Sequence, residues 1–362
     1  MNESQSTHYQ IRINKSEKLK AKPQTESLGF GQYFTDHMFV ARYSKDKGWY
    51  DLAIQPYQPL QLDPAASVLH YGQALFEGMK AFKQENGDIA LFSTQYNWQR
   101  MVFGAERLCM VAPPLDLFQE AVRKLVDLER DWIPQTKGSA LYIRPTLIGT
   151  EGFLGVRPSD EYIFFIILSP VGAYYKDGLK PVSIWVEEKY SRAAPGGLGA
   201  TKAGANYAGS LKAASEAKKQ GCSQVLWLDT EKKYVEEVGT MNVFFVFKNE
   251  IATPSLDGTI LAGGVRQCII EMLRQWGLPI VERKVSLEEI KSAVQNGDLL
   301  EVFGTGTAAV VSPVGCLCAD QWTLQIGSQA GQRGELTQKI YKELTDIQYG
   351  LKLDEYNWIE KI

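Results

Sequence analysis

The sequence predicts an α+β fold in two domains. Its 362 residues are enough for one large or two ordinary domains, each with its own core. Strand-like and helix-like segments follow one another without the regular strand–helix–strand repeat of a parallel sheet. The segment AYYKDGLKP (173–181) combines a Lys-Asp-Gly turn with a proline, as interdomain linkers often do.

Four parts are expected along the chain. Residues 1–24 are polar and should form a flexible arm, with a short strand at YQIRIN. Residues 25–174 should form the N-terminal domain and residues 175–183 the linker. Residues 184–362 should form the C-terminal domain.

The N-terminal half should contain strands, then two helices, then two more strands. The sequence from Phe30 to Phe82 is strand-like and is broken by Gly, Pro and Asp. Apolar residues recur at helical spacing over 98–108 and over 118–125. ALYIRPTLIG (140–149) and EYIFFIILSPVG (161–172) follow as apolar strands.

The C-terminal half should also mix strands and helices. A helix over 208–219 should end at Gly221, a plausible C-cap. Ser286 and Glu289 form a capping box before a second helix, and the last helix should span 335–348. The strands expected here are VSIWVEE (182–188), SQVLWLD (223–229) and NVFFVF (242–247).

Composition and charge argue against several classes of partner. The net charge of -3 and the absence of a Lys/Arg block argue against nucleic-acid binding. No apolar run reaches transmembrane length, and the polar N-terminus lacks the apolar stretch of a signal peptide, so we expect a cytoplasmic protein without membrane contact. Five cysteines and three histidines indicate reduced thiols and no metal site.

Glycine clusters in three loops: GGLGATKAGANY, LAGGVRQ and FGTGTAA. Ordinary tight turns are one interpretation, but three loops beside apolar strands favour a shared anion cradle. Gly263 and Gly264 precede a helix that should start near Val265, and its N-terminal amides would suit a phosphate. Neither a Walker A motif nor a dinucleotide fingerprint is present, so a nucleotide is a poor candidate.

Lys202 lies between glycines in ATKAGANY. It could be a solvated loop lysine, or a lysine in a crowded site where burial and nearby cations lower its pKa and make it a nucleophile for an aldehyde. A phosphate cradle with such a lysine indicates pyridoxal phosphate, which also needs an acid near its pyridinium nitrogen. Glu236 or Glu237 could supply that acid, although both could instead be solvated.

Nine segments resemble the branched-chain aminotransferases of fold type IV, in the family's order from Phe30 to near Gly350. The resemblance implies a smaller N-terminal α/β domain, a larger C-terminal domain with a β-barrel-like core, and a homodimer with active sites near the subunit interface. The segments are FGQYFTDHMF, LHYGQALFEGMKAF, LYIRPTLIG, SPVGAYY, TKAGANYAGSLKA, QVLWLD, EEVGTMN, LAGGVRQ and EVFGTGTAAVVSPV.

The resemblance also implies roles in binding pyridoxal 5'-phosphate. Lys202 resembles the lysine that bonds to the cofactor and shuttles the proton, and Glu237 resembles the acid beside the pyridine nitrogen. Tyr207 resembles the phenol that hydrogen-bonds the 3′ oxygen. The phosphate cup would be Arg100, Gly264, Val265 and Thr307, with Arg192 and Thr240 at further cofactor positions.

The substrates implied are branched-chain L-amino acids (Leu, Ile, Val) with 2-oxoglutarate, and the products are 2-oxo acids and L-glutamate. Backbone amides of Thr307 and Ala308 would bind the α-carboxylate, and Arg144 the γ-carboxylate of glutamate. Aromatic rings give an apolar wall that fits branched side chains. The wall residues would be Phe30, Tyr71, Phe76, Tyr142 and Tyr174.

The sequence departs from the family's pattern at two places, and two alternative functions are considered. Gly264 stands where the family often has a branched residue, and Ala309 and Ser312 replace a redox C-x-x-C of vertebrate members. Another enzyme of the fold, a D-amino-acid aminotransferase or an aminodeoxychorismate lyase, would be shorter and lack the aromatic-rich FTDHM and LFEGMKAF. A non-catalytic protein that retains the fold is disfavoured because Lys202 and Glu237 are both present.

Overall fold

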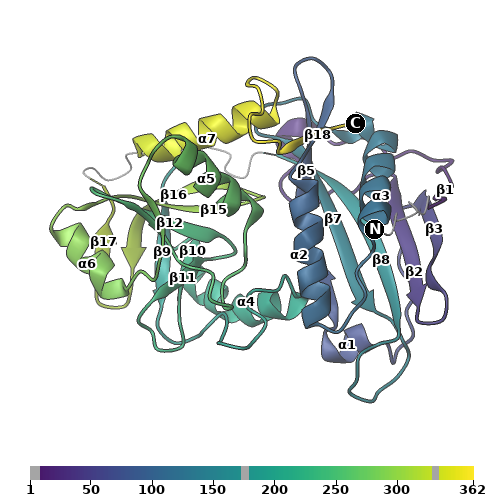
Figure 1. Ribbon diagram of the computed structural model, residues 1–362, viewed down its shortest axis with the longest axis horizontal. Coiled ribbons are helices and arrows are strands. Elements are labelled where there is room, and N and C mark those ends of the chain that lie inside the picture. The colour runs from purple at the N-terminus through teal and green to yellow at the C-terminus, as the bar shows by residue number, and fades with distance from the viewer. Residues whose placement is uncertain (1–8, 173–178, 328–333) are drawn as a thin grey trace, which may run out of the picture. The chain divides into compact units, whose positions relative to one another are not determined.

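The computed structural model describes residues 9–172, 179–327 and 334–362, and the chain forms two compact units (Figure 1). Unit 1 contains the chain up to Tyr174 together with two later segments, 202–204 and 346–362. Unit 2 contains residues 175–201 and 205–345.

Figure 1 labels the helices of unit 1 and most of its strands. Two 3-10 turns, η1 (Thr25–Ser27) and η2 (Arg130–Trp132), accompany them. The helices are α1 (Ser67–Tyr71), α2 (Thr94–Arg107) and α3 (Leu115–Leu128). The strands are β1 (Arg12–Ile13), β2 (His37–Ser44), β3 (Gly48–Pro56), β4 (Ala74–Phe76), β5 (Met79–Lys83), β6 (Ile89–Phe92), β7 (Ala140–Gly149), β8 (Glu161–Val171) and β18 (Ile359–Lys361).

Unit 2 carries the remaining elements. Two helices cross into unit 1 at one end: α4 (Gly204–Lys219) at its first residue and α7 (Glu335–Gln348) at its last residues. The other helices are α5 (Gly264–Gln275) and α6 (Leu287–Gln295). The strands are β9 (Val182–Glu187), β10 (Gln224–Leu228), β11 (Val235–Val238), β12 (Asn242–Phe247), β13 (Ile251–Thr253), β14 (Ile280–Glu282), β15 (Leu299–Gly306), β16 (Val310–Cys318) and β17 (Thr323–Gln325).

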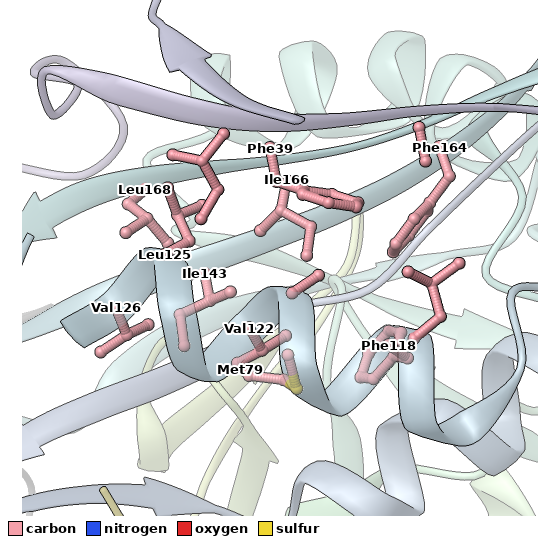
Figure 2. Close-up of a cluster of buried hydrophobic side chains, with 14 of the residues drawn as sticks. Phe39, Met79, Phe118, Val122, Leu125, Val126, Ile143, Phe164, Ile166 and Leu168 are labelled. Atoms are coloured by element: carbon pink, nitrogen blue, oxygen red, sulfur yellow. The ribbon is translucent and has the colours of Figure 1, made fainter. Parts of the chain in front are cut away.

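One sheet organises unit 1, in the order β1-β3-β2-β8-β7-β5-β6-β18, with β4 paired to β7. Helix α3 covers one face, because Phe118, Val122 and Leu125 recur at helical spacing and all are buried. Figure 2 shows these side chains pointing toward Phe39 and Ile166 of the sheet. The burial of this apolar face is what fixes α3 on the sheet.

The sheet of unit 2 curls into a barrel-like core. Strands β11, β10, β9, β16, β15 and β12 pair in that order. The two end strands meet again at a bridge between Val238 and Met241, whose backbone groups exchange two hydrogen bonds of 2.9 Å. The predicted α+β fold with a barrel-like C-terminal core is therefore confirmed.

Most predicted elements occur where the sequence places them. β7 covers 140–149 and α7 covers 335–348, as expected. The Ser286 hydroxyl accepts the backbone N–H of Glu289 at 3.0 Å, which is one half of the expected capping box of α6. The short strand expected within YQIRIN is β1, which pairs with β3.

The two units differ from the expected domains at two places, and the expected domain boundaries stay a prediction. The segment 346–362 belongs to unit 1 and not to the C-terminal domain, because β18 pairs with β6. With this segment and 202–204 counted, unit 1 is the larger unit, although the N-terminal domain was expected to be the smaller. In the linker, 175–178 lie outside the described residues, and β9 already begins at Val182.

No helix in the described ranges combines the length and the apolar composition that crossing a membrane requires.

The core under α3 should dominate the stability of unit 1. Phe118→Ala should lower the free energy of unfolding by about 3–5 kcal/mol, because the ring is fully buried and its removal leaves a cavity. Phe103→Ala on α2 is the matched control: its ring is 52% exposed, and its loss should change the value by less than about 0.5 kcal/mol. Denaturant titration of both variants measures the difference, and equal midpoints would contradict it.

Candidate active site

Lys202 is held in unit 1 by a short backbone pairing. The carbonyl of Lys202 accepts the N–H of Phe76 at 3.2 Å, and Leu75 forms an antiparallel bridge with Ala203. Lys202 lies two residues before the start of α4, so it sits between a strand-like contact and a helix start. The glycine-flanked lysine is therefore fixed by its backbone and is not part of a free loop.

The surroundings of the Lys202 amine favour its neutral form. Burial, and secondly the positive charge of Arg100, lower the pKa of Lys202 from 10.5 to about 8, against the opposing charges of Glu77 and Tyr142. The Nζ atom lies 4.9 Å from the ring centroid of Phe76. The interpretation as a crowded, partly desolvated lysine is confirmed, and the solvated loop lysine is wrong.

A buried ion pair beside Lys202 was not anticipated from the sequence. Arg100 Nε and Nη2 donate to the two carboxylate oxygens of Glu77 at 2.7 and 2.6 Å. Asn97 Nδ2 also donates to Glu77, at 2.7 Å, and the Glu77 side chain is fully buried. This fork fixes the orientation of the guanidinium. The only signal in the sequence is a glutamate within the otherwise apolar run LFEGMKAF.

Four of the predicted pocket residues contact one another in unit 1. Tyr142 and Arg144 share a face of β7, and Arg144 Nη2 donates to the Tyr142 hydroxyl at 2.9 Å. The Arg144 guanidinium carbon lies 4.6 Å from the Phe76 ring centroid, and Phe30 packs edge-on against Tyr142 at 5.0 Å. Arg144 Nε is buried without a hydrogen-bond partner among the described residues. The group combines an apolar wall with an incompletely satisfied guanidinium.

Gly78 permits the close approach of Tyr142. A Cβ atom at this glycine would lie 2.1 Å from the Tyr142 hydroxyl oxygen, which no real contact tolerates. The glycine in LFEGMKAF therefore sets the position of the phenol, and through the phenol that of Arg144.

The other two pocket residues lie elsewhere. The Tyr71 hydroxyl, at the end of α1, donates to the carbonyl of Leu154, and the Tyr71 ring is exposed. Tyr174 lies outside the described residues.

Unit 2 gathers four of the predicted cofactor residues around one cavity. Glu237 is 3% exposed, and its Oε1 accepts the N–H of Leu261 at 2.8 Å and pairs with Arg192 Nη2 at 3.2 Å. Arg192 Nη2 also donates to the carbonyls of Gly199 and Thr259, and Arg192 Nε is buried without a partner in the described chain. The cavity is lined by Arg192, Tyr207, Glu237 and Thr240, and by Thr201, the residue before Lys202.

Glu236 and Glu237 have separate surroundings although they are neighbours. On β10, Leu228 pairs with Val235 and Trp227 pairs with Glu237, so Glu236 is the extra residue of a β-bulge. Glu236 does not line the cavity of Glu237. Burial raises its pKa, and a hydrogen bond with Thr259 and the charge of Arg192 partly oppose this. Both carboxylates are buried, so the alternative of two solvated glutamates is wrong.

The remaining predicted positions present backbone amides. Gly264 and Val265 are the first residues of α5, and no side chain caps this helix start. Thr307 and Ala308 lie in the turn between β15 and β16. Val310, just after the turn, has φ +62°, a left-handed conformation that is unusual for a β-branched residue. A helix start and a strained turn are typical of anion-binding backbone.

Comparisons with known proteins identify the family. The class IV aminotransferase family matches residues 74–315. Branched-chain-amino-acid transaminase 1 of Bacillus subtilis is 51% identical, over 97% of this chain and 99% of its own length. The branched-chain amino acid aminotransferase of Escherichia coli has the same fold, with a TM-score of 0.74, 26% identity, and coverage of 89% of this chain and 98% of its own. A further solved branched-chain amino acid aminotransferase, from T.th. and with pyridoxamine 5'-phosphate, aligns with a TM-score of 0.73 at 24% identity, over 89% and 97% of the two chains. The chain therefore belongs to the class IV aminotransferases, in the family of branched-chain amino acid aminotransferases.

Proposed function

We propose that this protein transfers amino groups between branched-chain L-amino acids (Leu, Ile, Val) and 2-oxoglutarate, with pyridoxal 5'-phosphate as cofactor. The observation that carries the proposal is Lys202, whose amine has a pKa of about 8 beside an apolar wall that also holds a guanidinium. The names of the relatives, branched-chain-amino-acid transaminases, support the same substrates.

The residues present fit pyridoxal phosphate. A lysine with a lowered pKa suits its aldehyde, a buried carboxylate with a cationic partner suits its ring nitrogen, and an uncapped helix start suits its phosphate. When bound, this cofactor supplies the aldehyde that captures the amino group and a ring that takes up the electron pair left at the substrate Cα.

Lys202 is proposed to act twice. As a neutral amine it would hold the cofactor at its aldehyde carbon, with the aldehyde oxygen leaving as water, and when not so bonded its Nζ would take a proton from the substrate Cα and carry it to the cofactor carbon C4′. Its lowered pKa serves both roles, because a neutral amine is needed as a nucleophile and as a base. Phe76 limits the water around Nζ, which is 4.9 Å from its ring centroid.

Unit 2 is proposed to hold the cofactor ring. The paired carboxylate of Glu237 would face the pyridine nitrogen, and its Arg192 partner keeps that negative charge in place. Tyr207 would donate to the 3′ oxygen, and Thr240 lines the same cavity. The phosphate would be bound by Arg100 and by the amides of Gly264, Val265 and Thr307.

The substrate pocket is proposed to serve two kinds of side chain. Phe30, Phe76 and Tyr142 offer apolar surface to Leu, Ile and Val. Arg144 would bind the distal carboxylate of glutamate or 2-oxoglutarate, with Nε available as an additional donor. The α-carboxylate would accept from the backbone amides of Thr307 and Ala308.

A homodimer is part of the proposal. Exposed apolar side chains gather around the contact between Tyr71 and Leu154, which joins α1 to the loop after β7. Such a patch is typical of a subunit interface. Its members are Leu69, Tyr71, Phe153, Leu154 and Val156. The expected cytoplasmic location stays a prediction.

Transamination can be tested directly by supplying a panel of amino acids with 2-oxoglutarate and measuring glutamate. L-Leucine, L-isoleucine and L-valine should react, and Lys202→Ala should lower the rate by several powers of ten, about the scale of losing a catalytic nucleophile. Borohydride treatment of the holoenzyme should leave a pyridoxyl label on Lys202. A label on Lys80, the other buried lysine with a pKa of about 8, or turnover of D-amino acids alone, would contradict the proposal.

The charges around Lys202 predict in which direction its pKa changes when each charge is removed. In the cofactor-free protein, labelling of Lys202 by acetic anhydride should rise with pH with a midpoint near 8, because the amine is neutral above its pKa. Glu77→Gln should move the midpoint down, since it removes a negative charge that favours the ammonium form. Arg100→Gln should move it up, since it removes a positive charge. Peptide mapping by mass spectrometry measures both shifts, and shifts in the same direction would refute the charge assignment.

Arg144→Met should damage the reaction of 2-oxoglutarate far more than that of leucine. Binding of the distal carboxylate without its cation should weaken by about 2–5 kcal/mol, whereas an isobutyl group requires no polar partner. Tyr142→Phe is the matched control, because it keeps the ring and removes only the hydroxyl that orients Arg144. The measurement is kcat/KM for each half-reaction. Equal losses for both substrates would mean that Arg144 has only a structural role.

A further inference from the structure

The loop 21–35, which carries Phe30, is closed at its base by hydrogen bonds. Lys20 precedes the loop and Asp36 follows it. The backbone N–H of Lys20 donates to Asp36 Oδ1 at 2.7 Å, and Lys20 Nζ donates to the carbonyl of Thr35 at 2.8 Å. Surface loops whose two ends are held this close together frequently have a function.

Asp36 joins the base of this loop to the core of unit 1. The residue is 7% exposed and directly precedes β2. Its Oδ2 accepts the indole N–H of Trp132 at 2.9 Å, and Trp132 belongs to the buried core under α3. The Asp36 carbonyl accepts the N–H of Tyr57 at 2.8 Å. One carboxylate oxygen therefore binds the entry of the loop, and the other binds the core.

Aromatic contacts add to the closure. The ring of Phe34, near the end of the loop, stacks on the ring of Tyr57 with centroids 5.2 Å apart and planes inclined by 10°. Lys20 Nζ lies 4.5 Å from the centroid of the same Tyr57 ring. The entry and the exit of the loop thus share one aromatic partner at the end of β3.

Phe30 reaches the proposed substrate pocket from the middle of this loop. Gly29 and Gly31 flank it with φ of +59° and +68°, left-handed conformations that glycine adopts without strain. The Gly29 carbonyl accepts the N–H of Gly172 at 3.0 Å, and the Phe30 ring packs edge-on against Tyr142. The Phe30 ring is 44% exposed, so its position depends on the loop backbone more than on its own packing.

We propose that Asp36 is a positioning residue that sets the substrate preference of the pocket, because it holds the loop 21–35 closed with Phe30 against Tyr142. This inference rests on the proposed function. Leucine, isoleucine and valine would bind through apolar surface that Phe30 supplies, whereas the distal carboxylate of 2-oxoglutarate would bind mainly through Arg144. Opening the base of the loop should therefore weaken the binding of leucine more than that of 2-oxoglutarate.

Hydrogen exchange of the holoenzyme tests the closure without using the reaction. In Asp36→Asn one carboxylate oxygen becomes an NH₂ donor, which cannot accept from either Lys20 N–H or Trp132 Nε1–H. Backbone amides of residues 21–35 should then exchange about tenfold faster, the scale of one lost hydrogen bond to a charged group. Asp88→Asn is the matched control, because this carboxylate of unit 1 pairs with Lys361 and should leave the loop unchanged.

A second variant keeps the test decisive if Asp36→Asn folds poorly. Lys20→Met keeps the apolar stem and removes the ammonium that donates to the loop, and the residue is exposed, so the fold should persist. It should speed exchange over 21–35 in the same direction.

Kinetics of the same variants test the effect on the substrates. KM for leucine should rise about tenfold with little change in kcat, the scale of losing part of an apolar pocket, and the values for 2-oxoglutarate should change far less. Asp36→Asn should add little to the effect of Phe30→Ala, because both substitutions act through the same ring.

Three results would each overturn the proposal: unchanged exchange over 21–35 in both variants, equal losses for leucine and 2-oxoglutarate, or additive effects of Asp36→Asn and Phe30→Ala. A failure of the proposed function has a different signature, since the wild-type enzyme would then not react with leucine at all. The exchange measurement is independent of that result.

Discussion

The backbone pairing between β4 and the segment around Lys202 is the constraint on which the candidate site depends. One hydrogen bond from Phe76 to the Lys202 carbonyl and one bridge between Leu75 and Ala203 bring a residue from the middle of the chain onto the sheet of unit 1. The same short strand ends at Phe76, whose ring faces both the Lys202 amine and the Arg144 guanidinium. Glu77 follows at once. A few backbone contacts therefore determine which charged groups lie near the Lys202 amine, and these charges help to set its pKa.

Those charges are themselves held by packing. Glu77 is fully buried, so its two oxygens need partners, and Arg100 and Asn97 of α2 supply them. Arg100 in turn opposes the protonation of Lys202, while Glu77 opposes its deprotonation. Burial decides the balance, because it penalises the ammonium form more than the paired carboxylate can favour it. Tyr142, which approaches Gly78 closely, then orients Arg144. The ionisation of one lysine thus depends on the packing of a strand, a helix and a glycine.

The long elements could be predicted from the sequence, and the short ones could not. β7 and α7 have enough residues for a periodic pattern, and a capping box marks the start of α6. β18 has three residues, too few for a pattern, so nothing in the sequence showed that the C-terminus returns to unit 1. Lys202 was indicated by its position between glycines, and Glu236 or Glu237 as the acid, but the choice of Glu237 and the pocket residues came from a family resemblance. Glu77 was missed because the sequence does not show which residue pairs with a glutamate in an apolar run. Its partner Arg100 lies in a later element, and only folding brings the two together.

The bulge in β11 explains how two adjacent glutamates can have different roles. In a regular strand, consecutive side chains point to opposite faces, and one glutamate would enter the apolar core of the barrel. Here the extra residue keeps Val235 and Val238 in that core, and each of the two carboxylates lines a cavity instead. Glu237 finds a cationic partner within the chain, in Arg192, while one oxygen of Glu236 lacks a partner among the described residues. The two carboxylates are buried to similar extents, so the difference between them lies in the charges around them. The positive charge of Arg192 acts on both carboxylates, but only Glu237 forms an ion pair with it.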